Sequence, residues 1–557
     1  MRLQLAAGLA DWLAKWAPLL LLFPAALLFV LVTSSRDVNV YDEGVILTAA
    51  SQVAIGHVPH RDFYANYGPA QFYFLAALFK VFGPSILVER LWGAAIKAAI
   101  ALCTYLLGNR LMPKSWSLIC CLACVVWLGF VENTAWPAWP ALLAALIGLK
   151  LLFDVFERAA ATPQILAAGV CVGVATLFRY DIGFLLCVAE TAVLASYRWG
   201  ETPMRGNLTV RLRNPMLFCA GVALVCLPVA AAFMCLGAVS DFYFDVVYFP
   251  AHNYAPTRSL PFPPLFTDAS SPLSAANIVY APILVAVAAL ARLSRLNAAG
   301  RRDDRSFFWK LVLLLVVMLS LFAKGLVRVS PIHMSLAVVP AFIILTTLLA
   351  TSTDHPGARR LPIATFTLGI AACAAAIPTY DALAAACAQA AVNLGWSMSP
   401  MKDGTPLARL RFFEIGRDRT RAIDYLHART VPGDPIFVGL SQHDRVYIND
   451  VGFYFISNLS PATKWYHFDP GLQTSAPIQQ LIIRDLANSR PQYIVLESQW
   501  AGVREPNASS LSSGVRLLDQ FIKEHYQPVA EFGSLSVLKA MPDWDRAVPL
   551  NSSGVDK

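Results

Sequence analysis

The chain has 557 residues, of which 57% are hydrophobic and 14% are charged, and its mean hydropathy is +0.54. A composition this apolar excludes an ordinary soluble domain of this length and predicts a protein that lies in a bilayer. The formal net charge is +8. Because most cations stand between apolar segments, membrane topology explains this charge and no nucleic-acid partner is expected.

Apolar windows long enough to cross a hydrocarbon core recur from residue 17 to about residue 378. We predict eleven spans, and the ends of the shortest ones are placed too tightly. Their approximate ranges are 17–33, 86–108, 117–131, 138–155, 164–180, 183–197, 215–237, 277–292, 307–324, 332–351 and 361–378. The sequence therefore predicts an α-helical polytopic membrane domain over residues 1–380.

The placement of Lys and Arg predicts the orientation, because cytoplasmic loops retain cations during insertion. With the N-terminus inside, the inside segments before residue 380 carry more than twice as many Lys and Arg residues as the outside segments. An odd number of spans then places the C-terminal part outside, together with the first loop.

The first outside loop, residues 34–85, contains two adjacent carboxylates, Asp42 and Glu43, shortly after the first span. A carboxylate at the bilayer edge is partly desolvated, so its basicity can be tuned, and it can meet a lipid-anchored and a water-soluble substrate together. Both are candidate catalytic residues, with Asp42 as the base. The alternative for Asp42 is a helix cap on the apolar run Val45–Ile55. That run and the amphipathic run Gln71–Phe82 are too short to span and are expected to lie along the interface.

Five motifs follow one another in and just after this loop. They are Asp-Glu-Gly at 42–44, Gly-x-x-Pro-x-Arg-Asp-Phe at 56–63, Tyr-Gly-Pro at 67–69, Phe-Gly-Pro-Ser at 82–85 and Arg90 at the head of the second span. This order resembles the GT-C glycosyltransferases. Within them it is most similar to the bacterial relatives of dolichyl-phosphate-mannose protein mannosyltransferases and of aminoarabinose lipid A transferases.

The resemblance implies a GT-C fold and transfer of a sugar from a polyprenyl-phosphate donor to a glycan, lipid or protein acceptor. The reaction is expected on the outer face of the cytoplasmic (inner) membrane, with inversion. In that family an acidic residue of the first loop is the base, and it maps to Asp42, with Glu43 as support or alternate base. Two carboxylates are too few ligands to define a divalent-metal site, and no cofactor is predicted.

Cations at the predicted outer ends of the spans could bind the phosphate of the donor, whose charge needs fixed cations or donors. The five candidates are Arg90, Arg179, Lys324, Arg328 and His333. Each has a structural alternative. Arg179 can serve only as the partner of Asp181. Lys324 and Arg328 can be interface anchors, and His333 can be a structural histidine.

Two outside loops offer candidate substrate-binding residues. The first loop supplies Arg61, Asp62 and Tyr67, and the extended loop 238–276 supplies His252, Asn253, Tyr254 and Arg258. Aromatic and amide side chains suit sugar stacking and hydroxyl recognition, but they suit an interface belt equally well. The alternative for Arg61 and Asp62 is an ion pair that stabilises the loop.

Residues 405–541 are polar and alternate between helix and strand patterns, which predicts an extracytoplasmic α/β domain. The predicted helices are 420–430, 478–488 and 517–526; the predicted strands are 435–440 and 493–496, with a β-prone segment at 529–538. The tail, residues 546–557, is expected to be disordered.

Two other classes of membrane protein share some of these features. A polytopic transporter or lipid flippase also has many spans, but it should show paired repeats and broken helices, and neither is evident. An O-antigen ligase or polymerase would rely on a large arginine-rich loop instead of an early acidic one. The chain has no phosphate-binding loop or dinucleotide fingerprint, so a nucleotide-sugar or ATP-driven reaction is unsupported.

Overall fold

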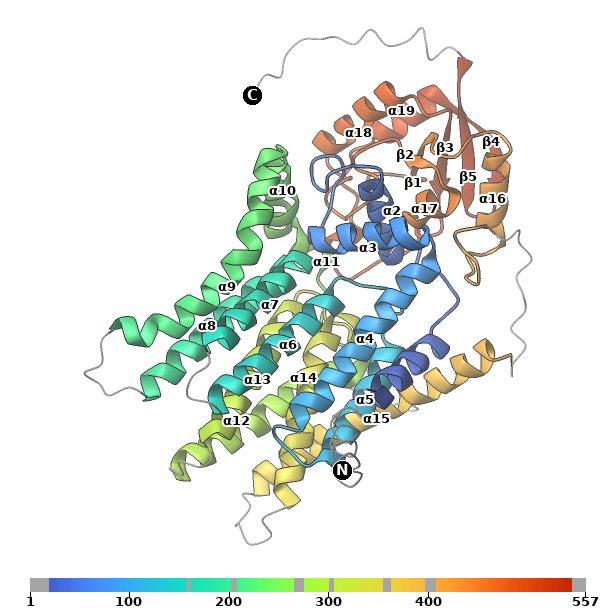
Figure 1. Cartoon of the computed structure of the whole chain (residues 1–557). Coiled ribbons are helices and arrows are strands. Elements are labelled where there is room, and N and C mark those ends of the chain that lie inside the picture. The colour runs from blue at the N-terminus through green and yellow to red at the C-terminus, as the bar shows by residue number, and fades with distance from the viewer. Residues whose placement is uncertain are drawn as a thin grey trace, which may run out of the picture.

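The computed structural model describes residues 20–157, 162–201, 208–264, 275–299, 305–353, 362–395 and 407–542. A bundle of long helices carries a smaller α/β region at one end (Figure 1). The tail that is predicted to be disordered, residues 546–557, lies outside the described residues.

Eight helices within the described residues are long and apolar enough to cross a membrane. They are α4 (Ile86–Gly108), α6 (Ala138–Glu157), α8 (Tyr180–Glu201), α9 (Leu208–Cys235), α12 (Ala281–Ala299), α13 (Arg305–Gly325), α14 (Pro331–Thr353) and α15 (Pro362–Asn393). Three shorter apolar helices coincide with the remaining predicted spans, namely Leu20–Val32, α5 (Lys114–Phe130) and α7 (Thr162–Phe178). The chain is therefore a multi-pass membrane protein, whereas the number of helices that cross the bilayer stays a prediction.

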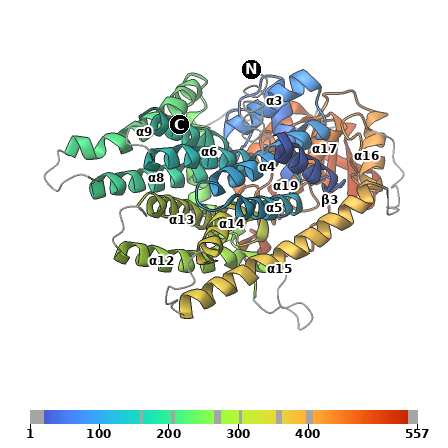
Figure 2. The ribbon, with the colours of Figure 1, turned by 60° about the horizontal axis from the view of Figure 1, so that its bottom comes forward.

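Some helix ends differ from the predicted ones. Helices α5 and α8 begin before residues 117 and 183, as expected for spans placed too tightly. Helix α15 contains Pro378 and continues to Asn393, well beyond the predicted end. The sequence after Pro378 is rich in alanine, the strongest helix former, which explains the extension. Figure 2 shows α15 running obliquely past the bundle toward the α/β region.

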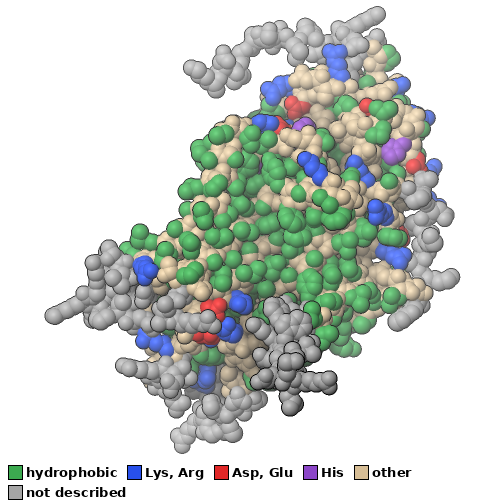
Figure 3. Space-filling view, in the orientation of Figure 1, with side chains coloured by type: hydrophobic (Ala, Val, Ile, Leu, Met, Phe, Trp, Pro, Cys, Tyr) green, Lys and Arg blue, Asp and Glu red, His purple; other side chains and the backbone are tan. Residues whose placement is uncertain are grey.

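Hydrophobic side chains cover the visible face of the bundle, and charged side chains gather near its two ends (Figure 3). The helices inside the bundle are apolar on most sides, as expected for segments that meet protein on one side and lipid on the other. Helix α14 is largely buried, whereas α9 is mostly exposed.

Helices α2 (Asp42–Ala54) and α3 (Pro69–Phe82) lie between the bundle and the α/β region (Figure 1). Helix α2 packs closely on α17 (Gly452–Ser457) of that region. A Cβ atom on Gly44 would come within 2.3 Å of the Gly452 amide nitrogen, so the contact requires glycine. Thr48 also donates a hydrogen bond to the Val451 carbonyl at 2.9 Å. The first loop and the C-terminal region are therefore one packed unit.

The segment after α9 is mostly helical, whereas the sequence suggested an extended loop. It forms α10 (Val239–Tyr243), π-helical turns at Phe244–Tyr248 and Pro250–Tyr254, and α11 (Ala255–Arg258). Pro250 and Pro256 have no amide hydrogen, so a regular α-helix cannot continue undisturbed through them. A 3-10 helix at Ala275–Tyr280 precedes α12.

The α/β region contains a five-stranded mixed sheet in the order β2-β1-β3-β5-β4. Its strands are β1 (Pro435–Leu440), β2 (Ser460–Pro461), β3 (Tyr493–Glu497), β4 (Tyr526–Phe532) and β5 (Leu535–Ala540). Strand β1 is parallel to β2 and β3, and β5 is antiparallel to β3 and β4. The remaining helical segments are α16 (Arg417–His427), α18 (Ala476–Ser489), a 3-10 turn at Ala508–Ser510 and α19 (Leu517–His525).

Both predicted strands and all three predicted helices of this region are present. The β-prone segment 529–538 contributes to a hairpin of β4 and β5 instead of one strand. Gly533 makes the turn at a φ of 59°, a left-handed conformation that favours glycine.

Candidate active site

Asp42 is the first residue of α2, and Asn39 caps that helix. Asn39 Oδ1 accepts hydrogen bonds from the amides of Tyr41 and Asp42 at 3.2 and 3.0 Å. Asn39 Nδ2 donates to Asp42 Oδ2 at 3.2 Å, and within the described residues this is the one hydrogen bond that the Asp42 carboxylate accepts. Because Asn39 supplies the cap, the Asp42 carboxylate is left available to take a proton.

Glu43 points elsewhere and forms a buried ion pair with Arg90 of α4. Arg90 Nη2 donates to Glu43 Oε2 at 2.8 Å, and Arg90 Nε contacts the other carboxylate oxygen. Arg90 Nη2 also donates to the Asp37 carbonyl at 3.0 Å. Glu43 is 0% exposed and Arg90 is 3% exposed, so each charge is neutralised mainly by the other. This pair fastens the start of α2 to the bundle.

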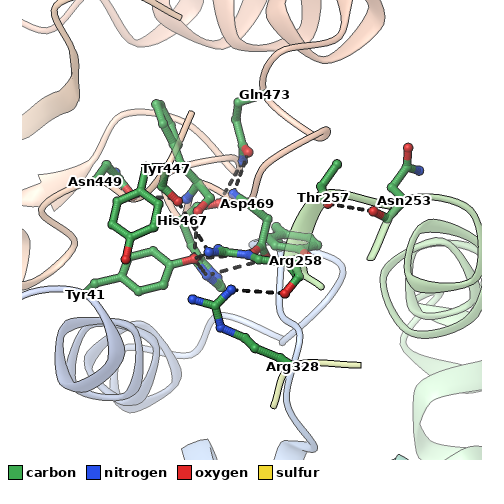
Figure 4. A network of polar contacts seen from close by, with 12 residues as sticks. Tyr41, Asn253, Thr257, Arg258, Arg328, Tyr447, Asn449, His467, Asp469 and Gln473 are labelled. Atoms are coloured by element: carbon green, nitrogen blue, oxygen red, sulfur yellow. Dashed lines mark hydrogen bonds and ion pairs between the residues drawn. The ribbon is translucent and has the colours of Figure 1, made fainter. Parts of the chain in front are cut away.

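Arg258, at the end of α11, is held by the C-terminal region (Figure 4). Arg258 Nη2 donates to Asp469 Oδ1 at 2.7 Å and to the Tyr41 hydroxyl at 2.8 Å. The Tyr64 hydroxyl donates to the other Asp469 oxygen at 2.9 Å. Burial opposes charge on Asp469, but the Arg258 and His467 charges outweigh it and lower the pKa of Asp469. The arginine is therefore fixed by two segments of the first loop and one of the C-terminal region.

Arg328, between α13 and α14, is held in the same manner. Its guanidinium donates to both carboxylate oxygens of Glu505, at 2.8 and 2.5 Å, and to the Arg258 carbonyl at 3.0 Å. Asn507 donates to Glu505 at 3.0 Å and to the Ser259 carbonyl at 2.8 Å. The C-terminal region thus places two arginines side by side at the end of the bundle.

Arg179, Lys324 and His333 gather around the indole of Trp136. Lys324 Nζ lies 4.8 Å from the Trp136 ring centroid, the Arg179 guanidinium lies 5.8 Å from it, and the His333 ring lies 5.9 Å from it. Arg179 also forms a bidentate ion pair with Asp181 at 2.7 and 3.0 Å. The expected Arg179–Asp181 pair is therefore present, and it stands inside the cation group.

These cations and Asp42 act on one another electrostatically. The charges of Arg179, Arg258, Lys324 and Arg328 all act on His333. Burial raises the pKa of Asp42, and the Asn39 hydrogen bond with the charges of Arg258 and Arg328 offsets only part of this effect. The structure therefore brings Asp42 together with four of the five predicted phosphate-binding residues, while Arg90 is occupied by Glu43.

Two predicted substrate-binding tyrosines lie in the same group. Tyr67 is buried, the Arg179 guanidinium lies 5.2 Å from its ring centroid, and the Asp42 charge adds to the effect of burial in raising the pKa of its hydroxyl. Tyr254 is half-buried, and the charges of Arg258, Arg179 and Arg328 act on its hydroxyl.

The other predicted substrate-binding residues lie apart from this group. Arg61 and Asp62 form an exposed ion pair with each other at 2.8 Å, as the structural alternative expected. His252 is exposed and contacts the Tyr248 carbonyl at 2.8 Å. Asn253 Nδ2 donates weakly to the Phe249 carbonyl at 3.4 Å. These contacts do not assign a substrate role to any of the four.

Sequence reasoning missed Tyr41, Trp136, Asp469, Glu505 and Glu132. Glu132, between α5 and α6, has a φ of 37°, which is unusual for a residue other than glycine. Burial raises the pKa of Glu132, and the Asp42 charge raises it further, so the two carboxylates are neighbours. Asp469 belongs to an aromatic run with sugar-compatible groups, but no sequence signal indicated that it would hold Arg258.

No group of three or more His, Cys, Asp and Glu side chains that could hold a metal ion occurs within the residues that the structure describes. Asp42 and Glu43 point to different partners and do not form a shared carboxylate site.

No family model and no curated protein matches the chain. The crystal structure of ArnT from Cupriavidus metallidurans in the apo state matches with a TM-score of 0.54 at 14% sequence identity, covering 96% of this chain and 99% of ArnT. The crystal structure of ArnT bound to undecaprenyl phosphate matches with a TM-score of 0.53 at 14% identity, covering 95% and 99%. This chain has the GT-C fold. The apo oligosaccharyltransferase of Archaeoglobus fulgidus gives a lower TM-score of 0.47 at 12% identity, covering 87% of this chain and 70% of that one.

The resemblance predicted from the first loop is thus confirmed for the fold. In this GT-C chain, the acidic residue, the cation group and the C-terminal region meet at one end of the helix bundle (Figures 1 and 4). At this level of sequence identity, the match supports the architecture, and the roles of individual residues must be argued from their contacts.

Proposed function

We propose that this protein is a membrane glycosyltransferase that moves a sugar from a polyprenyl-phosphate donor to an acceptor hydroxyl, with inversion. The observation that carries the proposal is the pairing of a partly desolvated Asp42 with a group of buried cations at one end of a GT-C bundle. ArnT of the same fold has been crystallised with undecaprenyl phosphate, which supports the donor class.

The proposed reaction needs a base on one side of the sugar and positive charge on the other. Asp42 takes the proton of the acceptor hydroxyl while its oxygen attacks the anomeric carbon. The bond from that carbon to the phosphate oxygen breaks, and the phosphate leaves with the electron pair. Arg258 and Arg328, with Arg179 and Lys324, stabilise the charge on the leaving phosphate.

The remaining predicted site residues receive supporting roles in the proposal. Glu43 and Arg90 are positioning residues, because each is occupied by the other. Tyr67 and Tyr254 line the donor site, and His333 adds a hydrogen-bonding group beside Lys324. His252 and Asn253 stay candidates for sugar contact, since the end of the loop to which they belong carries Arg258.

The proposed orientation places this end of the bundle, and with it the domain predicted at residues 405–541, on the extracytoplasmic side of the cytoplasmic membrane. It is supported by the excess of Lys and Arg in the opposite loops. The eleven helices that coincide with predicted spans fit the odd number that this orientation needs.

The test of the proposed function is turnover of polyprenyl-phosphate sugars by purified protein and by the Asp42→Asn variant. Loss of the base should lower turnover by roughly 10²–10⁴-fold. The Asn residue keeps the size of the side chain, and melting temperature and gel-filtration profile verify folding. Normal turnover by a folded variant would remove Asp42 from the role of base. If mass spectrometry finds no polyprenyl-phosphate sugar among copurified lipids and none is turned over, the donor class is wrong.

A further inference from the structure

An open groove lies between the first loop and the C-terminal region, on a different side of α2 from the cation group. Its cavity volume is about 390 Å³. Its lining comes from two stretches that are distant in sequence, residues 52–63 and residues 461–489. This volume is in the range of small-ligand sites. We propose that the groove binds a neutral glycan, the part of the acceptor that lies away from the reacting hydroxyl.

The polar groups in the groove are fixed by contacts within the protein. Asp485 Oδ2 accepts hydrogen bonds from the Thr463 hydroxyl at 2.9 Å and from the Lys464 amide at 3.2 Å. The Ser489 hydroxyl donates to the Asp485 carbonyl at 2.8 Å. Side chains held in this manner are preorganised for a ligand with many hydroxyl groups.

The groove is polar but its charges are mostly balanced. Asp62 is neutralised by Arg61, and Lys464 is neutralised by Asp241 at 2.6 Å. An anionic ligand would need a cation that has no such partner. A neutral ligand needs only donors and acceptors, and these are present in the amides of Gln52 and Asn488. The Gln52 side chain is buried and has no hydrogen-bond partner within the described residues.

A glycan fits this groove better than an extended peptide does. A peptide would add a strand to the edge of the sheet, and the edge strand here is β2, which has two residues, one of them Pro461. Proline has no amide hydrogen to donate, so the edge cannot continue a ladder. Aromatic rings below the polar groups suit the apolar faces of sugars, and Phe63 and Tyr466 lie in the lining with ring centroids 6.2 Å apart.

The groove is within reach of the proposed base. Gln52 lies ten residues after Asp42 on the same helix, which corresponds to about 15 Å. The next residues after the two aromatic ones, Tyr64 and His467, contact the Asp469 and Tyr41 network that holds Arg258. An acceptor longer than one sugar could therefore occupy the groove while its end approaches Asp42. This step rests on the proposed glycosyltransferase function, whereas binding to the groove does not.

The experiment compares binding of fluorescently labelled protein in nanodiscs to an array of neutral glycans, acidic glycans and unglycosylated peptides. Asn488 is an exposed residue of α18 that lines the groove, so Asn488→Trp should fill the groove without disturbing the core. Arg484 is exposed on the same helix and does not line the groove, so Arg484→Trp is the matched control. We expect neutral glycans to bind, with loss of binding in Asn488→Trp and normal binding in Arg484→Trp.

Several outcomes would overturn the proposal. They are absence of neutral glycan binding, preference for acidic glycans or for peptides, and neutral glycan binding that Asn488→Trp leaves intact. The Asp42→Asn variant separates this proposal from the proposed function. If it turns over donor normally but still binds neutral glycans through the groove, the base assignment fails and the groove proposal stands. If its turnover is lost but no glycan binds, the reverse holds.

Discussion

At the scale of single residues, two neighbouring carboxylates have different environments. Glu43 turns into the bundle and pairs with Arg90, whereas Asp42 remains beside Asn39 and within the field of Arg258 and Arg328. Consecutive residues of a helix point about 100° apart, so one can anchor the helix while the other faces a site. The structure thus separates an anchoring acid from a candidate base.

The environment of Asp42 predicts the pH dependence of the reaction. A base works only when ionised, and burial raises the Asp42 pKa, so kcat/KM should fall with decreasing pH at a higher pH than for an ordinary aspartate. The Arg328 charge lowers this pKa. Arg328→Gln should therefore move the acidic limb of the pH profile to higher pH. Lys523→Gln, an exposed change on α19, should leave the limb unmoved. A limb that moves to lower pH in Arg328→Gln would contradict the assignment.

The buried Glu43–Arg90 pair makes a separate prediction about stability. Removing one partner leaves a buried charge uncompensated, which costs about 3–5 kcal/mol. We expect a large drop in melting temperature for Glu43→Gln and for Arg90→Gln, and a smaller drop in the double variant than the two single drops combined. Strict additivity in thermal unfolding would show that the pair does not act as a unit.

At the scale of elements, α2 joins the bundle to the C-terminal region. Gly44 follows the carboxylate pair directly and meets the backbone of Gly452 on α17, where a Cβ atom has no room. The glycine of the Asp-Glu-Gly motif therefore has a packing role, which explains why it stands next to the acids. The position of Asp42 depends on this close helix contact.

Gly44→Ala should separate α2 from α17 and destabilise the protein by about 1–3 kcal/mol, the usual cost of overpacking. It should also lower turnover, because Asp42 is two residues away. Gly369→Ala on α15 is the control, since a Cβ atom there meets nothing within 4 Å and alanine favours a helix. Melting temperature and donor turnover measure both effects. Equal behaviour of the two variants would contradict the packing role of Gly44.

At the scale of the whole molecule, the C-terminal region completes a site that the membrane helices alone do not hold in place. Asp469 and Glu505 come from that region, and they orient Arg258 and Arg328 from the membrane part of the chain. The region is therefore expected to contribute to donor binding, in addition to the proposed glycan groove.

Asp469→Asn tests this contribution. Loss of a hydrogen bond to a charged group is worth about 1.5–3 kcal/mol, so kcat/KM for the donor should fall by roughly tenfold or more. Asp519→Asn is the matched control, because Asp519 pairs with His443 at 2.7 Å inside the same region and does not contact Arg258. Similar kinetic losses in both variants would indicate general damage to the region instead of misplacement of Arg258.

Much of the architecture could be predicted because it depends on neighbours along the chain. Apolar runs gave every span a matching helix, and the strand Pro435–Leu440 has the predicted ends. Asp42 was found from its place after a span, and four predicted cations do lie with it. Glu43 and Arg90 resembled site residues until their mutual burial was visible, and Asp469 could not be linked to Arg258 because more than two hundred residues separate them.

The sequence by itself determined the membrane class, the approximate helices and the acidic residue of the first loop. These follow from hydropathy and spacing, which act over a few residues. Only the tertiary structure decided which charges pair with one another, which acid stays available and where a groove opens beside α2. Those outcomes depend on contacts between distant segments, and in a medium of low polarity a buried charge is stable only where such a contact compensates it.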